Sequence, residues 1–343
     1  MKNKIYMVLR LGVGAAILLY VLTSIRMGAA ADYADMSLLE RLFHNIDLLK
    51  DKILGVDKLL FSAGLVLILV SYLLSFIRWY FLLRVHDINI PFKRVISLGF
   101  IGVLFNNVMP STVGGDIVKA YYATKDTSKR AVVVTTVLVD RIIGMGSLLL
   151  ISVAAAPFFL FNGQLREVAI VLILIFVLAL TGFWLMLHPR LMQKISLLRK
   201  GGASGKLIEM YKAFYFYKDK TRVLVWSVIM SVILQMMQIY VQYIFICAMG
   251  YKTASFSDFL ILIPAITYIC AIPISIMGWG VGEASYKALF NLVGISDVYS
   301  VGLSLISRIS MMAINLIGLP LYINHRPTES MKEIKESVKL KGE

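Results

Sequence analysis

The segment FNNVMPSTVGGD, residues 105–116, interrupts a long apolar run and decides how the rest of the chain is organised. It begins apolar and continues with a proline, two hydroxyl residues, two adjacent glycines and a carboxylate. An unpaired backbone polar group in hydrocarbon costs several kcal/mol, so such a break survives only where it is buried in protein or lines a water-filled cavity. A second segment, PISIMGWGVGE at residues 273–283, has the same order of proline, serine, glycines and acid. The pair predicts two interrupted membrane segments.

The composition is that of a helical protein that crosses a membrane several times. Of its 343 residues, 59% are hydrophobic, which exceeds the roughly 45–50% apolar content of soluble domains. The apolar runs reach about 20 residues, the length that a helix needs to span a bilayer, whereas a β-barrel would show short alternating strands. We therefore expect an all-α polytopic membrane protein.

The net charge is +15, and the basic residues lie mostly between the apolar segments. This placement predicts membrane lipids with anionic headgroups as partners, and no nucleic acid. The two cysteines and four histidines are scattered, and the chain has no phosphate-binding glycine loop, zinc-binding helix or nucleophile elbow. We expect no metal and no cofactor, and a homo-oligomer is an open alternative.

The basic residues also predict the topology. Lys2, Lys4 and Arg10 place the N-terminus in the cytoplasm by the positive-inside rule. Basic residues flank the range 95–120 on both sides, so we expect a re-entrant hairpin there. The basic tail, residues 324–343, is cytoplasmic only if residues 259–292 form a second hairpin from the outer face. Full spans are expected at about 5–23, 59–80, 131–159, 168–187, 223–249 and 299–323, and a surface helix at 36–49.

An internal repeat supports this topology. Asp116 precedes Arg141 by 25 positions, and Glu283 precedes Arg308 by the same number. Each unit consists of a span, a hairpin and a second span that carries an arginine at membrane depth. The units, about 59–159 and 223–323, start in opposite directions, which predicts an inverted-topology repeat of the kind found in transporters. The repeat and the first span form one predicted domain, residues 1–323.

The glycines and acids of the two breaks are candidate binding residues. Gly114 and Gly115 precede Asp116, and Gly280 and Gly282 precede Glu283. Glycines permit close approach of the backbone, and free N–H groups at the start of a helix favour an anion. We predict that these groups bind a phosphate or carboxylate. The alternative is that the acids only cap the helices that follow.

Arg141 and Arg308 lie inside predicted spans, where a charge costs about 2.5–3.5 kcal/mol on insertion scales. Each therefore needs a partner, and we expect the pairs Asp116–Arg141 and Glu283–Arg308, with Asp140 available to pair with the neighbours of Arg141. A structural ion pair is the alternative to a lipid-binding arginine. At the tip of the first break, Asn107 and Ser111 either pair with the broken backbone or line a headgroup path. Arg78 is expected to be a snorkelling anchor at the end of its span.

Three motifs resemble those of the flippase-like transmembrane family, also called the lysylphosphatidylglycerol synthase transmembrane region family. They are N-x-x-P-S-x-x-G-G-D at 107–116, D-R-x-x-G at 140–144 and G-x-G-E at 280–283. Some members carry a synthase domain after the membrane region, and the resemblance implies only the lipid-translocating part here. Members are associated with phospholipids, polyprenyl-linked glycans or hopanoids. The match extends interest to Asn107, Ser111, Gly114, Gly115, Asp116, Asp140, Arg141 and Glu283, whereas Arg308 is included because of the repeat.

The expected function is a lipid translocase, or flippase, that moves the headgroup of an anionic phospholipid or of a polyprenyl-linked or other glycolipid between the leaflets of the cytoplasmic membrane. Two alternatives stay open. One is a membrane-embedded transferase that uses Asp116, Asp140 or Glu283 as a base. The other is a carrier of a small soluble anion.

Overall fold

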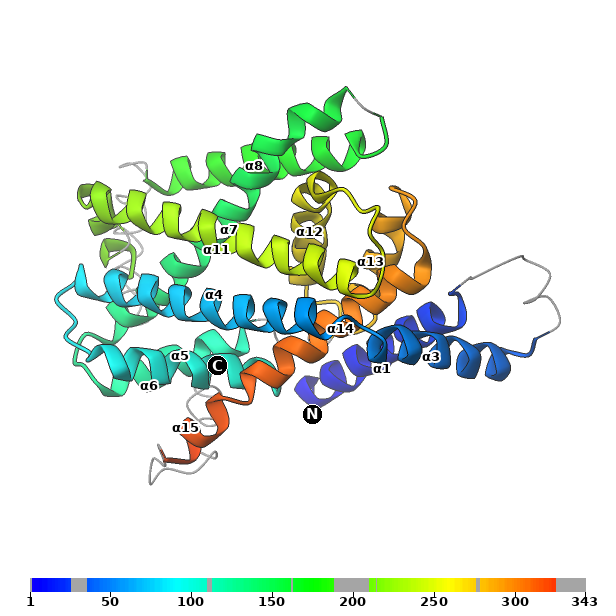
Figure 1. The fold of residues 1–343 in the computed structure, drawn as a ribbon. Helices are drawn as coiled ribbons and strands as arrows, with labels where there is room; N and C mark the ends of the chain where they lie inside the picture. The colour runs from blue at the N-terminus through cyan, green and yellow to red at the C-terminus, as the bar shows by residue number, and fades with distance from the viewer. Residues whose placement is uncertain are drawn as a thin grey trace.

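The computed structural model describes residues 2–25, 36–109, 113–161, 163–187, 210–213, 215–275 and 278–324, with side chains described from Leu11 in the first helix and up to Trp184 in the helix at 166–187. All regular structure in these ranges is helical (Figure 1). Five helices are long and apolar enough to cross a membrane. Ser111, residues 190–209 and residues 325–343 of the predicted tail lie outside the described residues.

The two predicted repeat units have corresponding helices. The first unit contains α4 (Lys58–Arg84), α5 (Phe92–Asn106), α6 (Gly114–Lys125) and α7 (Arg130–Leu160). The second contains α11 (Thr221–Ala248), α12 (Phe256–Ala271), α13 (Val281–Asn291), α14 (Asp297–Asn315) and α15 (Gly318–Asn324). Outside the units are α1 (Lys2–Thr23), α3 (Leu38–Leu54), α8 (Arg166–Leu187) and the short 3-10 helix η1 (Tyr217–Asp219). Helices are therefore present at the places of the expected spans and near 36–49, and the number of them that cross the membrane stays a prediction.

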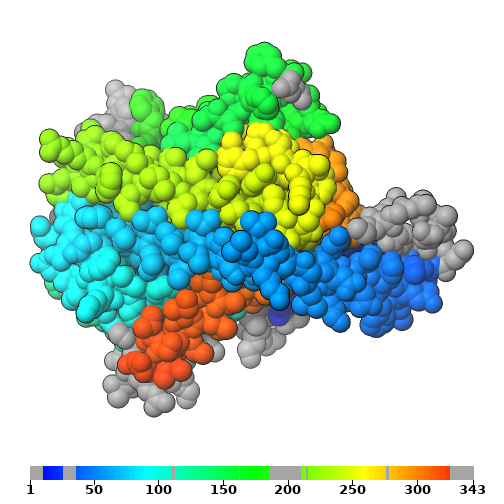
Figure 2. Space-filling model, viewed as in Figure 1, coloured from blue at the N-terminus to red at the C-terminus, as the bar shows by residue number. Residues whose placement is uncertain are grey.

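The first helices of the two units, α4 and α11, pack side by side at the centre (Figures 1 and 2). The ring of Phe245 lies on Gly64, where an added Cβ would come within 2.2 Å of the ring. Towards the other end of the pair, Arg78 donates a hydrogen bond to Ser231. From the first contact to the second, the residue number increases along α4 and decreases along α11. The two helices are therefore antiparallel, as an inverted repeat requires.

Each break separates two helices that are too short to span a bilayer alone. Helix α5 has 15 residues and α6 has 12, while α12 has 16 and α13 has 11, compared with about 20 for a span. The members of each pair pack against each other. The expected helix–break–helix units are thus present at both places, and their insertion from opposite membrane faces stays a prediction.

Helix α8 forms the outer edge of the molecule, next to α7 (Figure 1). Its side chains Leu174, Leu178 and Trp184 are all more than 60% exposed. Large apolar side chains that point outward along a helix of this hydrophobicity are typical of contact with lipid tails. The polar and charged groups described below lie on the inner side of the helices instead.

Candidate functional site

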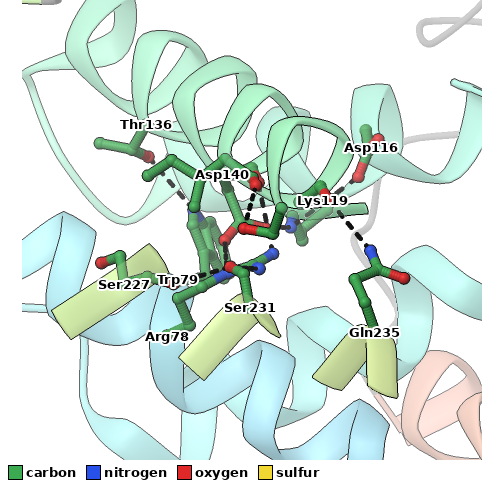
Figure 3. Close-up of polar contacts among 12 residues, drawn as sticks. Arg78, Trp79, Asp116, Lys119, Thr136, Asp140, Ser227, Ser231 and Gln235 are labelled. Atoms are coloured by element: carbon green, nitrogen blue, oxygen red, sulfur yellow. Dashed lines mark hydrogen bonds and ion pairs between the residues drawn. The ribbon is translucent and has the colours of Figure 1, made fainter. Parts of the chain in front are cut away.

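A buried ion pair lies within the first unit near one end of α4, and a hydrogen bond from its arginine reaches the second unit (Figure 3). Arg78 Nε lies 2.8 Å from Asp140 Oδ1, and a second guanidinium nitrogen donates to Ser231 on α11. Arg78 is only 5% exposed, so the prediction of a snorkelling anchor is wrong. Helices α4, α7 and α11 enclose the guanidinium, and a charge removed from water in this way needs a fixed partner.

Lys119 of α6 extends this pair. Its Nζ lies 3.6 Å from Asp140 Oδ2, 3.8 Å from Asp116 Oδ1 and 4.4 Å from the centre of the Trp79 ring. Trp79 donates from Nε1 to Thr136 Oγ1 at 3.1 Å, which holds the indole beneath the ammonium (Figure 3). Lys119 is buried. No local sequence pattern distinguishes this lysine from the other basic residues that follow the first break.

The expected pair Asp116–Arg141 is present, with 2.8 Å between Asp116 Oδ2 and an Arg141 nitrogen. Together with Arg78, Lys119 and Asp140 it forms what we call the charge cluster. Three cations and two carboxylates give the cluster a formal charge of +1. An excess positive charge among packed helices favours an anion nearby.

The expected pair Glu283–Arg308 is also present. Arg308 Nε lies 3.1 Å from Glu283 Oε1, and the guanidinium stacks 4.4 Å from the centre of the Trp279 ring. The other carboxylate oxygen accepts a hydrogen bond from the Gly280 N–H at 2.7 Å. Glu283 therefore both caps α13 and holds Arg308, whereas the described contacts of Asp116 are ion pairs with Arg141 and Lys119.

A cavity of about 530 Å³ lies between the two units. Helices α4, α5, α7, α11, α12, α13 and α14 all contribute to it. Its polar lining residues are Tyr72, Asn106, Asn107, Gln235, Gln238, Gln242, Thr267, Tyr286, Ser304, Ser307, Arg308 and Asn315. A cavity of this size and mixed polarity, enclosed by helices of one bundle, has the dimensions of a ligand site.

The segment that contains all three sequence motifs decides the family. Residues 7–318 match the family model described as the lysylphosphatidylglycerol synthase TM region. The chain belongs to this family. With the apolar helices, this identifies a multi-pass membrane protein.

Two relatives of this family member are UPF0104 membrane proteins. The protein from Methanocaldococcus jannaschii is 25% identical over 193 residues, which cover 51% of this chain and 56% of the relative, so the match spans little more than half of that protein. The protein from Pyrococcus horikoshii is 25% identical over 284 residues, which cover 75% of this chain and 84% of the relative. No solved structure matches the chain.

The structure divides the predicted site residues of this lysylphosphatidylglycerol synthase TM region between two places. Asn107, Gly282 and Arg308 line the cavity. Asp116, Asp140 and Arg141 belong to the charge cluster instead. The roles of all of these residues in binding a substrate stay predictions.

Each of the remaining glycines has a close neighbour. A Cβ on Gly115 would lie 2.1 Å from the Gly102 carbonyl oxygen, and the Gly115 N–H already donates to Asn106 Oδ1 at 2.9 Å. A Cβ on Gly114 would meet Met109 at 2.2 Å. Gly280 has φ +78 and approaches Gly14 of α1, where a Cβ would lie 2.4 Å from the carbonyl oxygen. These contacts give the glycines a packing role, and their binding of an anion stays a prediction.

The sequence analysis missed the glutamines of the cavity. Gln235, Gln238 and Gln242 occupy positions i, i+3 and i+7 of α11 and share one face of the helix. This spacing could have indicated a polar interior face, because amides rarely repeat on one face of an apolar span unless that face meets protein or water.

Proposed function

We propose that this protein is a lipid translocase that moves the polar headgroup of a membrane lipid between the two leaflets of the cytoplasmic membrane, with both chain ends on the cytoplasmic side. The observation that carries this proposal is the cavity of about 530 Å³, lined in part by polar side chains, among helices long enough to cross a bilayer. A headgroup that crosses hydrocarbon needs hydrogen-bond partners along the way, and the cavity supplies them.

Positive charge near the cavity favours lipids with a phosphate. Arg308 lines the cavity directly, and the charge cluster in the first unit carries a formal charge of +1. Guanidinium groups bind phosphate oxygens in a fixed geometry, and such bonds are about twice as strong as those between neutral groups. An anionic phospholipid or a lipid with a phosphate-linked headgroup therefore fits this charge.

The inverted repeat supplies a mechanism for movement. Helices α4 and α11 pack against each other where the two units meet, so a rocking motion of one unit against the other would open the cavity to each leaflet in turn. The acyl tails would remain in the bilayer while the headgroup passes the cavity.

The test is lipid movement in vesicles that contain the purified protein. A phosphatidylglycerol with a fluorescent acyl chain is reconstituted with the wild type, Arg308→Gln or the control Gln164→Met, and a membrane-impermeant quencher reports transfer between leaflets. Gln164 is exposed in the connection between α7 and α8. We expect Arg308→Gln to slow transfer at least about tenfold, the value of one lost charge-assisted bond, and Gln164→Met to leave it unchanged. Equal transfer with folded wild type, folded Arg308→Gln and empty vesicles would reject the proposal.

The transferase alternative receives less support from the geometry. Asp116, Asp140 and Glu283 are each within 3.1 Å of an arginine nitrogen. A carboxylate oxygen that accepts from an arginine has one lone pair fewer with which to take a proton from a substrate. Mass spectrometry of the lipids after incubation separates the two functions, because a transferase changes the mass of a lipid and a translocase does not.

A further inference from the structure

The side-chain amides of the cavity are oriented by hydrogen bonds that use their N–H groups. Gln235 Nε2 donates to the Gly144 carbonyl at 3.1 Å (Figure 3), and Gln238 Nε2 donates to Ser71 Oγ. Ser71 Oγ itself donates to the Ile68 carbonyl, so it accepts from the glutamine. Within the described part of the chain, neither Oε1 receives a hydrogen bond. Both glutamines therefore present a carbonyl oxygen, an acceptor, to the cavity.

A third acceptor comes from α14. Asn107 Nδ2 donates to the Met312 carbonyl at 3.1 Å, and its Oδ1 accepts from Asn315 Nδ2 at 2.7 Å. This chain of bonds fixes the Asn315 amide and leaves its Oδ1 buried without a partner among the described residues. Asn315 is 5% exposed and lines the cavity. A buried acceptor without a donor costs about 1–3 kcal/mol, so this atom favours a ligand that donates.

The same cavity also holds a donor. Gln242 Oε1 accepts from Ser307 at 2.7 Å and from Tyr286 at 3.2 Å, which turns the Gln242 N–H groups to the remaining space. A phosphate oxygen can only accept and an ammonium group can only donate, whereas a hydroxyl does both. The three acceptors, together with the donors of Gln242 and Arg308, fit hydroxyl groups.

The charges of the lining disfavour a cationic ligand. Among the described lining residues, Arg308 carries the only formal charge. The carboxylate paired with it, Glu283, is 0% exposed and is not among the lining residues. An ammonium headgroup would therefore meet a guanidinium and no accessible carboxylate.

We propose that the cavity binds a hydroxyl-rich headgroup, that of a glycosyl or polyol lipid, through the carbonyl oxygens of Gln235, Gln238 and Asn315. This rests on the proposed function and names the class of headgroup that it moves. Where a phosphate links the polyol to the lipid, Arg308 would bind that phosphate. The group that all of these lipids have in common is the polyol, with or without the phosphate.

The test measures binding separately from transport. Native mass spectrometry of the purified protein is carried out with monoglucosyl-diacylglycerol, phosphatidylinositol, phosphatidic acid and lysyl-phosphatidylglycerol of identical acyl chains. The variants are Gln235→Met and Asn315→Leu, with Gln164→Met as the matched control on the exposed connection. Thermal unfolding of each variant shows that it is folded.

We expect the two polyol lipids to bind best, and Gln235→Met and Asn315→Leu to weaken their binding roughly fivefold to tenfold per lost hydrogen bond. Phosphatidic acid should be unaffected by these two variants. Tighter binding of phosphatidylinositol than of the glucosyl lipid would show that the site also recognises the phosphate. Equal binding of these two lipids would show that it recognises the polyol alone. Tighter binding of phosphatidic acid or of the lysyl lipid, or polyol binding unchanged in folded variants, would overturn the inference. Polyol binding without leaflet transfer would instead reject the proposed translocase and leave the inference standing.

Discussion

Gln238 on α11 donates a hydrogen bond to Ser71 on α4, and the two residues are 167 positions apart. The same offset separates Asp116 from Glu283 and Arg141 from Arg308. Residues that are equivalent in the two units and also touch each other lie on the axis that relates the units. The central α4–α11 contact therefore lies on the axis of the inverted repeat, and Gln238 places a cavity-lining amide on that axis.

The two units have diverged around this axis. The offset relates Asp140 to Ser307 and Lys119 to Tyr286. In the first unit these positions belong to the charge cluster, whereas in the second unit both residues donate to Gln242 beside the cavity. At these positions the first unit thus carries charged groups and the second carries neutral hydrogen-bonding groups beside the cavity.

Removing one partner of the buried pair should destabilise the protein strongly. Asp140→Asn leaves the Arg78 guanidinium enclosed without a carboxylate, and breaking a buried pair costs about 3–5 kcal/mol. The measurement is the free energy of unfolding in a denaturant titration of the detergent-solubilised protein. The control is Asp126→Asn. The side chains of Arg94 and Asp126 in this pair are 24% and 27% exposed, so loss of the pair should lower the free energy of unfolding by at most about 1 kcal/mol. Equal losses in the two variants would contradict a buried role for Arg78.

Two glycines should be intolerant of alanine for steric reasons. At Gly115 and Gly280 the added Cβ would lie 2.1 Å and 2.4 Å from backbone oxygens of α5 and α1. Backbone atoms cannot change rotamer to make room as a side chain can. Each substitution should therefore lower the free energy of unfolding by about 1–3 kcal/mol. The measurement is the shift in thermal unfolding. Gly146→Ala is the control, because nothing lies within 4 Å of its added Cβ; a similar loss there would show that helix position, and not packing, is responsible.

Stability should fall in acid through His86, in the connection between α4 and α5. Burial, aided by Lys129 and opposed by Asp87, lowers the pKa of His86 from 6.5 to about 4. Between these pKa values the unfolded chain binds a proton at His86 that the folded protein excludes. The contribution of neutral His86 to the free energy of unfolding is therefore complete above pH about 6.5 and is lost as the pH falls through about 4. His86→Phe, which keeps the ring contacts with Phe216 and Tyr217, should flatten the thermal stability between these pH values. The control His44→Phe, on an exposed position of α3, should retain the wild-type slope, and a slope unchanged in both would exclude His86 as its source.

Arg141 should matter more for transport than for stability. The side chains of Arg141 and Asp116 are 28% and 31% exposed, and a partly exposed pair contributes about 1 kcal/mol or less. Arg141→Gln is therefore expected to unfold within about 1 kcal/mol of the wild type and to slow lipid transfer at least about tenfold. The two assays are the denaturant titration and the vesicle assay on one preparation. If the folded variant transfers lipid at the wild-type rate, the Asp116–Arg141 pair has only a structural role.

Much of the site could be anticipated because the membrane makes charge expensive. Arg141 and Arg308 needed partners, and the matched spacing to Asp116 and Glu283 identified them before any contact was known. The structure confirms both pairs.

The sequence by itself determined the helical multi-pass class, the two interrupted segments and the repeat, since each depends on the length of apolar runs and on spacings within the chain. Only the tertiary structure decided that Arg78 and Lys119 are buried and that Gln235 and Gln238 face a cavity. Helix α4 is apolar on all sides, so its residue pattern does not show which face meets protein and which meets lipid. That choice is made by contacts with α7 and α11, which lie far away in the chain.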